Sequence, residues 1–358
     1  MSAVLDQEFS AWLAGMAEAL DSVPHHADAV LPALAGAGLL GAGVPAQQGG
    51  RGGAPGEALA VTAAIAEHSL SAAFVYWAQR VVIECVLASP NQALVARLLP
   101  RLLAGELAGA PGLSNAMRAL SGLGRMQNRV SPQGDGVLLD GGIPRASNLR
   151  RAGFVAVVAA EHAGGEAAIY AVPHDAPGVQ REGDHEMLAL RATHTAALRF
   201  EGVALGEEWR LHPQAASFLP ALRPFMLALQ CGLGIGLARA SLDSARRHTP
   251  KHSVLSPEIV WLDAAVALLE RRLATGLAGG GLGASPAELI GMRIRMVQLA
   301  NDAVQLELQA LGAQAYARGN GNGFARRLRE AAFLPILTPT LVQLKTDLAR
   351  MPAPARAA

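Results

Sequence analysis

The chain has 358 residues, 51% of them apolar and 16% charged, with a formal net charge of +1. This composition excludes a disordered chain, and 30 basic against 29 acidic residues give none of the basic excess typical of nucleic-acid binders. The two cysteines exclude a disulfide scaffold and favour the reducing cytoplasm. An apolar chain with so few charges indicates an oligomer that hides part of its surface.

No membrane span is expected, because a span needs about 20 mostly apolar residues. The uncharged run 224–238 is too short and contains Gln230. The longer run 29–50 contains Pro32, Pro45 and several glycines, and it indicates a helix followed by a turn.

Residues 7–108 are predicted to be helical. Apolar residues recur at helical spacing in 9–20 and again in 29–40, and VPAQQGGRGGAPG (44–56) breaks the pattern. Residues 56–89 predict a long helix, Asn91 is a candidate cap for the next one, and Pro100 should end or kink that helix.

Short β-rich runs follow between turn signals, at 136–143, 153–160, 167–173 and 195–205. Their spacing predicts an antiparallel barrel or sandwich, and the lack of long helices between them argues against a dinucleotide-binding α/β domain. Helical patterns then return at 218–247, 256–277, 285–317 and 325–350, which predicts a four-helix bundle. The expected divisions are 1–108, 109–212, 213–350 and a frayed tail, 351–358.

Taken one by one, the short motifs in the sequence indicate no catalytic or metal-binding site. GNGNG (319–323) follows a helix rather than a strand, so an interhelical turn is favoured over a phosphate loop. Pro250 lies between His248 and His252, which argues against a helical metal pair, and no metal is expected. Cys85 and Cys231 lie in apolar runs and are predicted to be buried, inert thiols.

Several segments, in order and spacing, resemble the acyl-CoA dehydrogenase superfamily over about residues 9 to 350. They are LPALAGAGLLGAGVPAQQGGRGG (31–53), GLSNAMRALSG (112–122), PRASN (144–148), LALRATHTAALRFEGVAL (188–205), QALGAQA (309–315) and RRLREA (326–331). The resemblance implies a mainly helical fold with an N-terminal helical domain, a central antiparallel β-barrel and a C-terminal four-helix bundle. It also implies a homodimer or homotetramer, and a cytoplasmic role in fatty acid metabolism.

The same resemblance implies FAD, bound between the β-domain and the bundle, with its adenosine part reaching a neighbouring subunit. Carried over by position, the residues that line the flavin ring and its phosphates are Leu113, Ser114, Ser121, Ser147 and Asn148. Gln309 and Gly312 match residues that contact the dinucleotide, and Thr340 keeps a family threonine. Arg329 matches the arginine of a family ion pair in which Glu330 would replace the aspartate.

The departures from the family pattern bear on catalysis. The family's proton-abstracting glutamate aligns with Thr338, whose hydroxyl cannot act unaided as a general base. At the alternative position where some relatives carry the base, this sequence has Arg223-Pro224-Phe225, so that base is missing too. HTPKH (248–252) replaces the turn that holds the pyrophosphate, and Arg145 replaces the tryptophan beside the flavin. Glu258, Asp263, Glu270 and His194 are other candidate bases, for which surface or structural roles are favoured.

Three functions therefore stay open. The first is a flavin dehydrogenase that acts on the CH–CH group of a CoA-linked or carrier-linked acyl thioester, with a relocated or absent base, and passes electrons to an electron-transfer flavoprotein or a reductase. The second is a flavin monooxygenase of the same fold, which needs no such glutamate. The third is a non-catalytic subunit or binding module that partners an active homologue.

Overall fold

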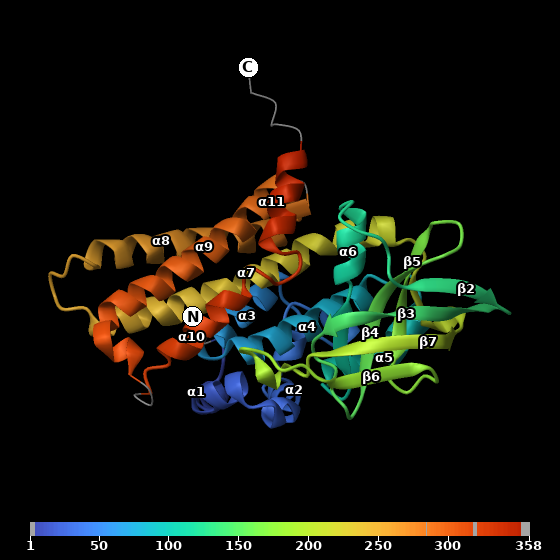
Figure 1. Ribbon diagram of the computed structural model, residues 1–358, viewed down its shortest axis with the longest axis horizontal. Helices are drawn as coiled ribbons and strands as arrows, with labels where there is room; N and C mark the ends of the chain where they lie inside the picture. Colours follow the sequence, from blue (N-terminus) through green and yellow to red (C-terminus); the bar gives the residue numbers. More distant parts are fainter. Residues whose placement is uncertain (1–3, 284, 318–320, 352–358) are drawn as a thin grey trace, which may run out of the picture.

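The computed structural model describes residues 4–283, 285–317 and 321–351. Ala284, the first two residues of the GNGNG turn and the tail beyond Met351 lie outside the described residues. Figure 1 shows an elongated molecule with a helical bundle at one end, a β-sheet at the other and the N-terminal helices beneath both.

The N-terminal part consists of α1 (Gln7–Ser22), α2 (Ala27–Gly36), α3 (Gly56–His68), α4 (Leu70–Leu87) and α5 (Gln92–Leu103). The single long helix expected over 56–89 is wrong, because Ser69 adopts an extended conformation and its hydroxyl caps α4 by accepting from the Ala72 N–H. The Asn91 cap is confirmed, with its Oδ1 accepting from the Leu94 N–H at 3.1 Å. Pro100 does not end α5, which continues to Leu103.

The central sheet, within the described residues, has eight strands. They are β1 (Ala108–Gly112), β2 (Arg129–Gln133), β3 (Gly136–Ala146), β4 (Phe154–Glu161), β5 (Ala167–Pro173), β6 (Val179–Asp184), β7 (Ala196–Leu205) and β8 (Arg210–His212). The order is β6-β7-β3-β2-β4-β5-β8, and β1 pairs with β4. The prediction of an antiparallel sheet is wrong for two strand pairs, because β1 runs parallel to β4 and β2 pairs in parallel with β4 at one residue pair.

The C-terminal helices are α7 (Ala215–His248), α8 (Ser256–Ala278), α9 (Pro286–Leu311), α10 (Phe324–Phe333) and α11 (Leu341–Arg350). The helix expected over 325–350 is interrupted by residues 334–340, which contain Pro335 and Pro339. Thr340 restarts the helix with a capping box, since its hydroxyl and the side chain of Gln343 each bind the other residue's backbone N–H. α9 ends earlier than expected, because Gly312 adopts a positive φ of 54°.

One continuous hydrophobic core joins these parts. The longest helix, α7, packs against α9, α3, α8 and α4 (Figure 1). Helices α4 and α7 are long and apolar enough to cross a membrane, but 89% of the apolar window of each is buried inside the protein. Their apolar character is thus accounted for by core packing.

Candidate active site

The larger of two adjoining cavities lies where the sheet meets α4, α6 (Ser114–Leu120) and the segment between α10 and α11, and it has a volume of about 630 Å³. That volume is in the range of small-molecule and cofactor sites. Hydroxyl, cationic and aromatic side chains share its wall: Ser114, Ser147, Thr195, Thr338 and Thr340; Arg118 and Arg145; Phe74, Trp77 and Phe333.

A chain of hydroxyl groups leads from this cavity into the interior. Ser147 Oγ lies 2.7 Å from Thr195 Oγ1, and Thr195 Oγ1 lies 2.8 Å from Thr193 Oγ1. Thr193 donates its only hydroxyl proton to the Leu190 carbonyl, so it must accept from Thr195, which in turn accepts from Ser147. Ser147 therefore presents an oxygen lone pair, an acceptor, to the cavity.

Aromatic side chains form an apolar part of the cavity wall. The rings of Phe74 and Trp77 stack at 5.2 Å, and Phe333 meets Phe74 edge-on at 4.8 Å. The indole N–H of Trp77 donates to the Met226 carbonyl at 3.2 Å, which fixes the ring. This wall excludes water from one face of whatever planar group binds there.

Two buried polar residues bind the segment Leu334–Thr340. This segment supplies Leu337, Thr338 and Thr340 to the cavity wall. Gln230 on α7 donates to the Thr338 carbonyl at 2.8 Å. Arg293 on α9 donates to Gln230 Oε1 at 3.1 Å and to the Leu334 carbonyl at 2.9 Å. Burial lowers the pKa of Arg293. Together, Gln230 and Arg293 tie the start of this segment and Thr338 to the bundle.

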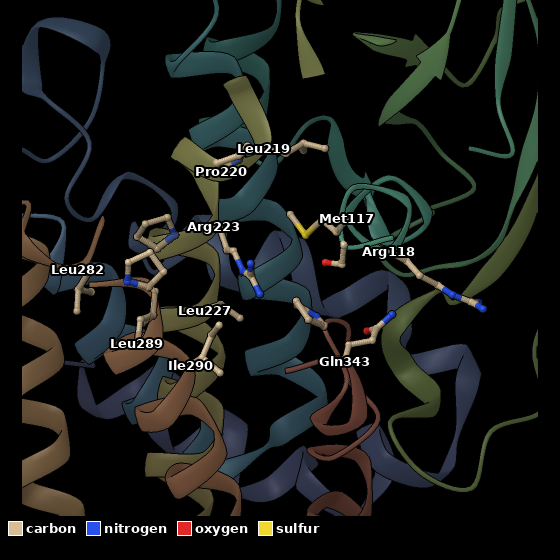
Figure 2. Close-up of a pocket in the computed structure, with 14 residues that line it drawn as sticks. Met117, Arg118, Leu219, Pro220, Arg223, Leu227, Leu282, Leu289, Ile290 and Gln343 are labelled. Atoms are coloured by element: carbon tan, nitrogen blue, oxygen red, sulfur yellow. The ribbon is translucent and has the colours of Figure 1, made fainter. Parts of the chain in front are cut away.

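A smaller cavity of about 280 Å³ adjoins the larger one, and Arg118 and Gln343 line both. Its wall is mostly apolar and comes from α6, α7 and α9 (Figure 2). Arg223 points into it, as Figure 2 shows, and forms an ion pair with Asp347 at 2.6 Å. Ser121 also lines this cavity.

The sequence-based candidates thus divide into groups. Ser114, Ser147, Thr338 and Thr340 line the larger cavity, as does Arg145. Leu113 is buried without lining either described cavity.

Three further candidates lie elsewhere. The Asn148 amide is used inside the protein, donating to Gln79 Oε1 at 2.8 Å and to the Gly109 carbonyl at 3.0 Å. Gln309 and Gly312 are exposed at the end of α9 and line neither cavity.

None of the alternative bases lines either cavity. Asp263 pairs with Arg246 at 2.9 Å and Glu270 pairs with Arg239, while Glu258 is exposed. His194 bonds Asp28 at 3.0 Å. Among the described residues that line the two cavities, arginine is the only ionisable type, so no side chain there has the pKa of a general base near neutrality.

Both cysteines are buried, and burial raises the pKa of Cys231 to about 12. The prediction of inert thiols is consistent with this environment. No group of three or more metal-ligating side chains occurs in the part of the chain that the structure describes.

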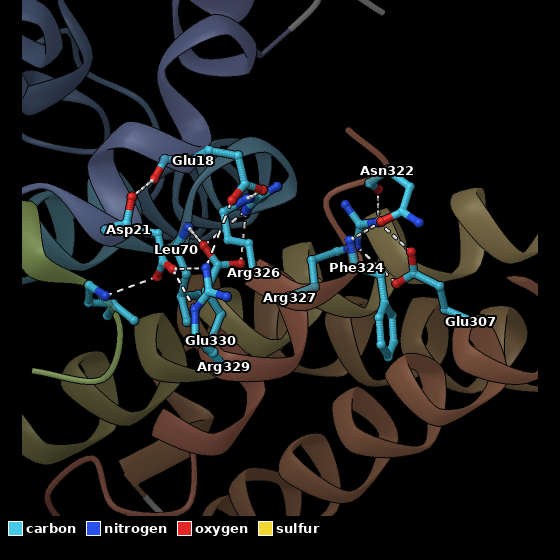
Figure 3. A network of polar contacts seen from close by, with 12 residues as sticks. Glu18, Asp21, Leu70, Glu307, Asn322, Phe324, Arg326, Arg327, Arg329 and Glu330 are labelled. Carbon is cyan, nitrogen blue, oxygen red and sulfur yellow. Dashed lines mark hydrogen bonds and ion pairs between the residues drawn. The ribbon is translucent and has the colours of Figure 1, made fainter. Parts of the chain in front are cut away.

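The ion pair implied for Arg329 and Glu330 does not form (Figure 3). Glu330 instead accepts from Arg326 Nη1 at 2.9 Å and from the Leu70 N–H at 3.0 Å. Arg329 donates to Asp21 on α1, with its Nη2 at 2.6 Å from Oδ2. Neighbouring residues on a helix point in different directions, so each finds its own partner.

Sequence reasoning did not identify Phe74, Trp77, Gln230 and Arg293 as parts of the site. The available signal was a polar residue in an apolar run, which is the case for Gln230 within 224–238. A buried polar residue needs a hydrogen-bonding partner, but the sequence does not show which segment provides it.

Comparisons with known proteins agree with this fold. Residues 3–106 match the family of the acyl-CoA dehydrogenase N-terminal domain, and no curated protein matches the chain. Among solved structures, glutaryl-coenzyme A dehydrogenase in complex with glutaryl-CoA is 19% identical over 98% of this chain and 96% of that chain, with a TM-score of 0.79. Butyryl-CoA dehydrogenase from Megasphaera elsdenii is 18% identical over 95% and 94%, also with a TM-score of 0.79.

KijD3, in complex with FMN and dTDP-3-amino-2,3,6-trideoxy-4-keto-3-methyl-D-glucose, is 19% identical over 97% of this chain and 92% of that chain, with a TM-score of 0.79. The N-terminal part of the chain thus matches the acyl-CoA dehydrogenase N-terminal domain, and the chain as a whole has the fold of these enzymes.

Proposed function

We propose that this protein is a flavin-dependent oxidoreductase that binds FAD in the larger cavity, and that its reaction is a monooxygenation rather than the α,β-dehydrogenation of an acyl thioester. The observation that carries this choice is the absence of a proton acceptor among the described side chains that line the two cavities. Dehydrogenation requires a base to remove the α-proton, and Thr338 cannot serve as one.

The larger cavity has the chemistry that a flavin ring requires. Ser147 offers an acceptor to a ring N–H, the side chains of Phe74 and Trp77 cover an apolar face, and Arg145 offers positive charge to a phosphate. When bound, the flavin would supply the redox chemistry, and the residues of this chain would orient it and exclude water. KijD3, which has this fold, is known in complex with FMN, and this supports a flavin here.

The smaller cavity would then hold the substrate beside the flavin. Its apolar wall of Met117, Leu227, Leu289 and Ile290 suits the carbon chain of an acyl thioester or a similar small molecule. A reductase or an electron-transfer flavoprotein would supply or remove electrons.

Gln309 and Gly312 are exposed and line neither cavity. A dinucleotide that they contact would therefore be bound by another copy of the chain, as in a homo-oligomer. A dehydrogenase with its base on a second copy of the chain is the alternative reaction. A non-catalytic subunit is less well supported, because the protein has two adjoining cavities and a chain of hydroxyl groups that leads from one of them.

The first test is the visible absorption spectrum of the purified protein titrated with FAD. Saturable bands are expected, and Ser147→Ala should weaken FAD binding about fivefold, the value of one hydrogen bond. Ser131→Ala, on an exposed strand position, is the matched control. If the wild type binds no FAD even at high FAD concentration, the proposal is refuted.

The second test separates the reactions. Anaerobic addition of acyl-CoA thioesters should leave the flavin oxidised. Reduction by an added reductase, followed by oxygen, should give a hydroxylated product. Anaerobic bleaching by a thioester would instead establish the dehydrogenase.

A further inference from the structure

The chain of hydroxyl groups behind the larger cavity ends at a backbone carbonyl that is held in place. Thr193 donates its hydroxyl proton to the Leu190 carbonyl at 2.8 Å, and the Leu190 N–H donates to Asp21 Oδ1 on α1 at 3.0 Å. Thr193 is 2% exposed and lines neither of the two cavities. The inner end of the chain is therefore out of reach of a ligand and anchored to α1.

The cavity end of the chain is joined to the inner end through the backbone. The Asn148 N–H donates to the Thr193 carbonyl at 2.8 Å. Ser147, which directly precedes Asn148, lines the larger cavity together with Thr195. The backbone bond thus keeps Ser147 close to Thr193, with Thr195 between them at oxygen–oxygen distances of 2.7 and 2.8 Å.

Only one arrangement of the three hydroxyl protons satisfies every contact of the chain. Each hydroxyl has one proton, and the proton of Thr193 bonds the Leu190 carbonyl, which can only accept. If Thr195 donated to Ser147, the oxygen atoms of Thr195 and Thr193 would face each other at 2.8 Å without a proton between them. Thr193 therefore decides the direction in which Ser147 donates, although it does not line the cavity.

We propose that Thr193 is a positioning residue of the larger cavity, which acts through Thr195 to hold the Ser147 hydroxyl as an acceptor for a ligand N–H. The inference rests on the proposed function, because the flavin ring is the ligand whose N–H would meet Ser147. Without the Thr193 hydroxyl, Thr195 is free to donate to Ser147, and the Ser147 proton then turns into the cavity. A donor would face the N–H of the ring, and the hydrogen bond to the ligand would be lost.

Titration of the full-length protein with FAD, followed by visible absorbance, tests the inference. Thr193→Val should weaken FAD binding about fivefold, the value of one hydrogen bond. Thr193→Ser keeps a hydroxyl and should restore most of the wild-type affinity. In a Ser147→Ala background, Thr193→Val should weaken binding by no more than about twofold further, because the acceptor that it orients is already gone.

Thr62→Val is the matched control. Thr62 on α3 is fully buried, donates its hydroxyl proton to the Ala58 carbonyl at 2.7 Å and lines neither cavity. This variant loses the same kind of buried hydroxyl as Thr193→Val, so it should lose a similar amount of stability. Its FAD affinity should remain that of the wild type.

Thr195→Val breaks the chain one step nearer the cavity and should cause the same loss of affinity, which keeps the inference testable if Thr193→Val does not fold. Wild-type affinity in Thr193→Val would overturn this inference alone. So would a loss of equal size with and without the Ser147 hydroxyl, or a matching loss in Thr62→Val. If the wild type binds no FAD, the proposed function and this inference fail together.

Discussion

The side-chain amide of Gln230 donates to the backbone carbonyl of Thr338 at 2.8 Å, and this bond joins the middle of α7 to the wall of the larger cavity. Gln230 is fully buried, and its amide oxygen accepts from Arg293, itself buried. The position of Thr338 in the cavity thus depends on two residues more than 40 positions before it, on α7 and α9.

Gln230→Leu should destabilise the protein by about 2–4 kcal/mol, because it leaves both the Thr338 carbonyl and the Arg293 Nε proton without a partner in the interior. Urea denaturation measures this. Gln298→Leu, at an exposed position on α9, should change the unfolding free energy by less than about 0.5 kcal/mol. Comparable effects of the two substitutions would show that the bond to Thr338 contributes nothing.

The broad architecture could be predicted from periodicity, because helices and strands differ in the spacing of their apolar residues. What periodicity missed were breaks and pairings. Ser69 interrupts a run that is apolar on both sides, and β1 (AGAPG) has almost no strand-forming residues. β1 is a strand because β4 pairs with it, and pairing partners are not visible in local sequence.

The same limit applies to the residues of the candidate site. Ser147 and Thr338 could be predicted because they fall within recognisable local segments. Gln230 and Arg293 could not, since their role arises only when α7, α9 and the segment after α10 meet. Asn148 also falls in a matching segment, and the sequence does not show that its amide donates to Gln79 and Gly109.

Thr338→Glu should introduce the missing proton acceptor, because Thr338 lines the larger cavity close to where the smaller one opens beside Pro339. If lack of a base is what prevents dehydrogenation, this variant should show anaerobic flavin bleaching by butyryl-CoA that the wild type lacks. Thr338→Gln has a similar size without a titratable group and should remain inactive. Bleaching by the glutamine variant would mean that the carboxylate is not responsible.

Asp21 connects three parts of the protein (Figure 3). This fully buried carboxylate on α1 accepts from the Leu190 N–H at 3.0 Å and from Arg329 on α10 at 2.6 Å. Asp21→Ala should cost about 3–5 kcal/mol, since it leaves the buried Leu190 N–H without an acceptor and Arg329 with only the more distant carboxylate of Glu18. Glu18 bonds Arg326 but is 61% exposed, so Glu18→Ala should cost less than about 1 kcal/mol. Thermal or urea unfolding of both variants checks the ranking, which a larger loss in the Glu18 variant would contradict.

His194 should make the protein less stable in mild acid. It is buried after the short helix Arg191–Thr193, with its Nε2 3.0 Å from Asp28 Oδ1. Burial lowers the pKa of His194 more than Asp28 and Asp184 raise it, and burial likewise lowers the pKa of His68.

The folded protein therefore binds fewer protons than the unfolded chain below about pH 6.5, the ordinary histidine pKa. Stability is present above that pH and is lost as the pH falls towards the folded-state pKa of each histidine. His194→Asn keeps a side chain that tolerates the positive φ of 46° at this position and removes the titrating ring.

The unfolding free energy of this variant, measured by urea denaturation between about pH 5 and 8, should depend less steeply on pH than that of the wild type. His25→Asn replaces an exposed histidine and should keep the wild-type slope. A slope that is unchanged in the His194 variant, or that has the opposite sign in the wild type, would assign the acid sensitivity to other groups. His68→Asn would then be the next substitution to measure, because burial lowers its pKa in the same direction.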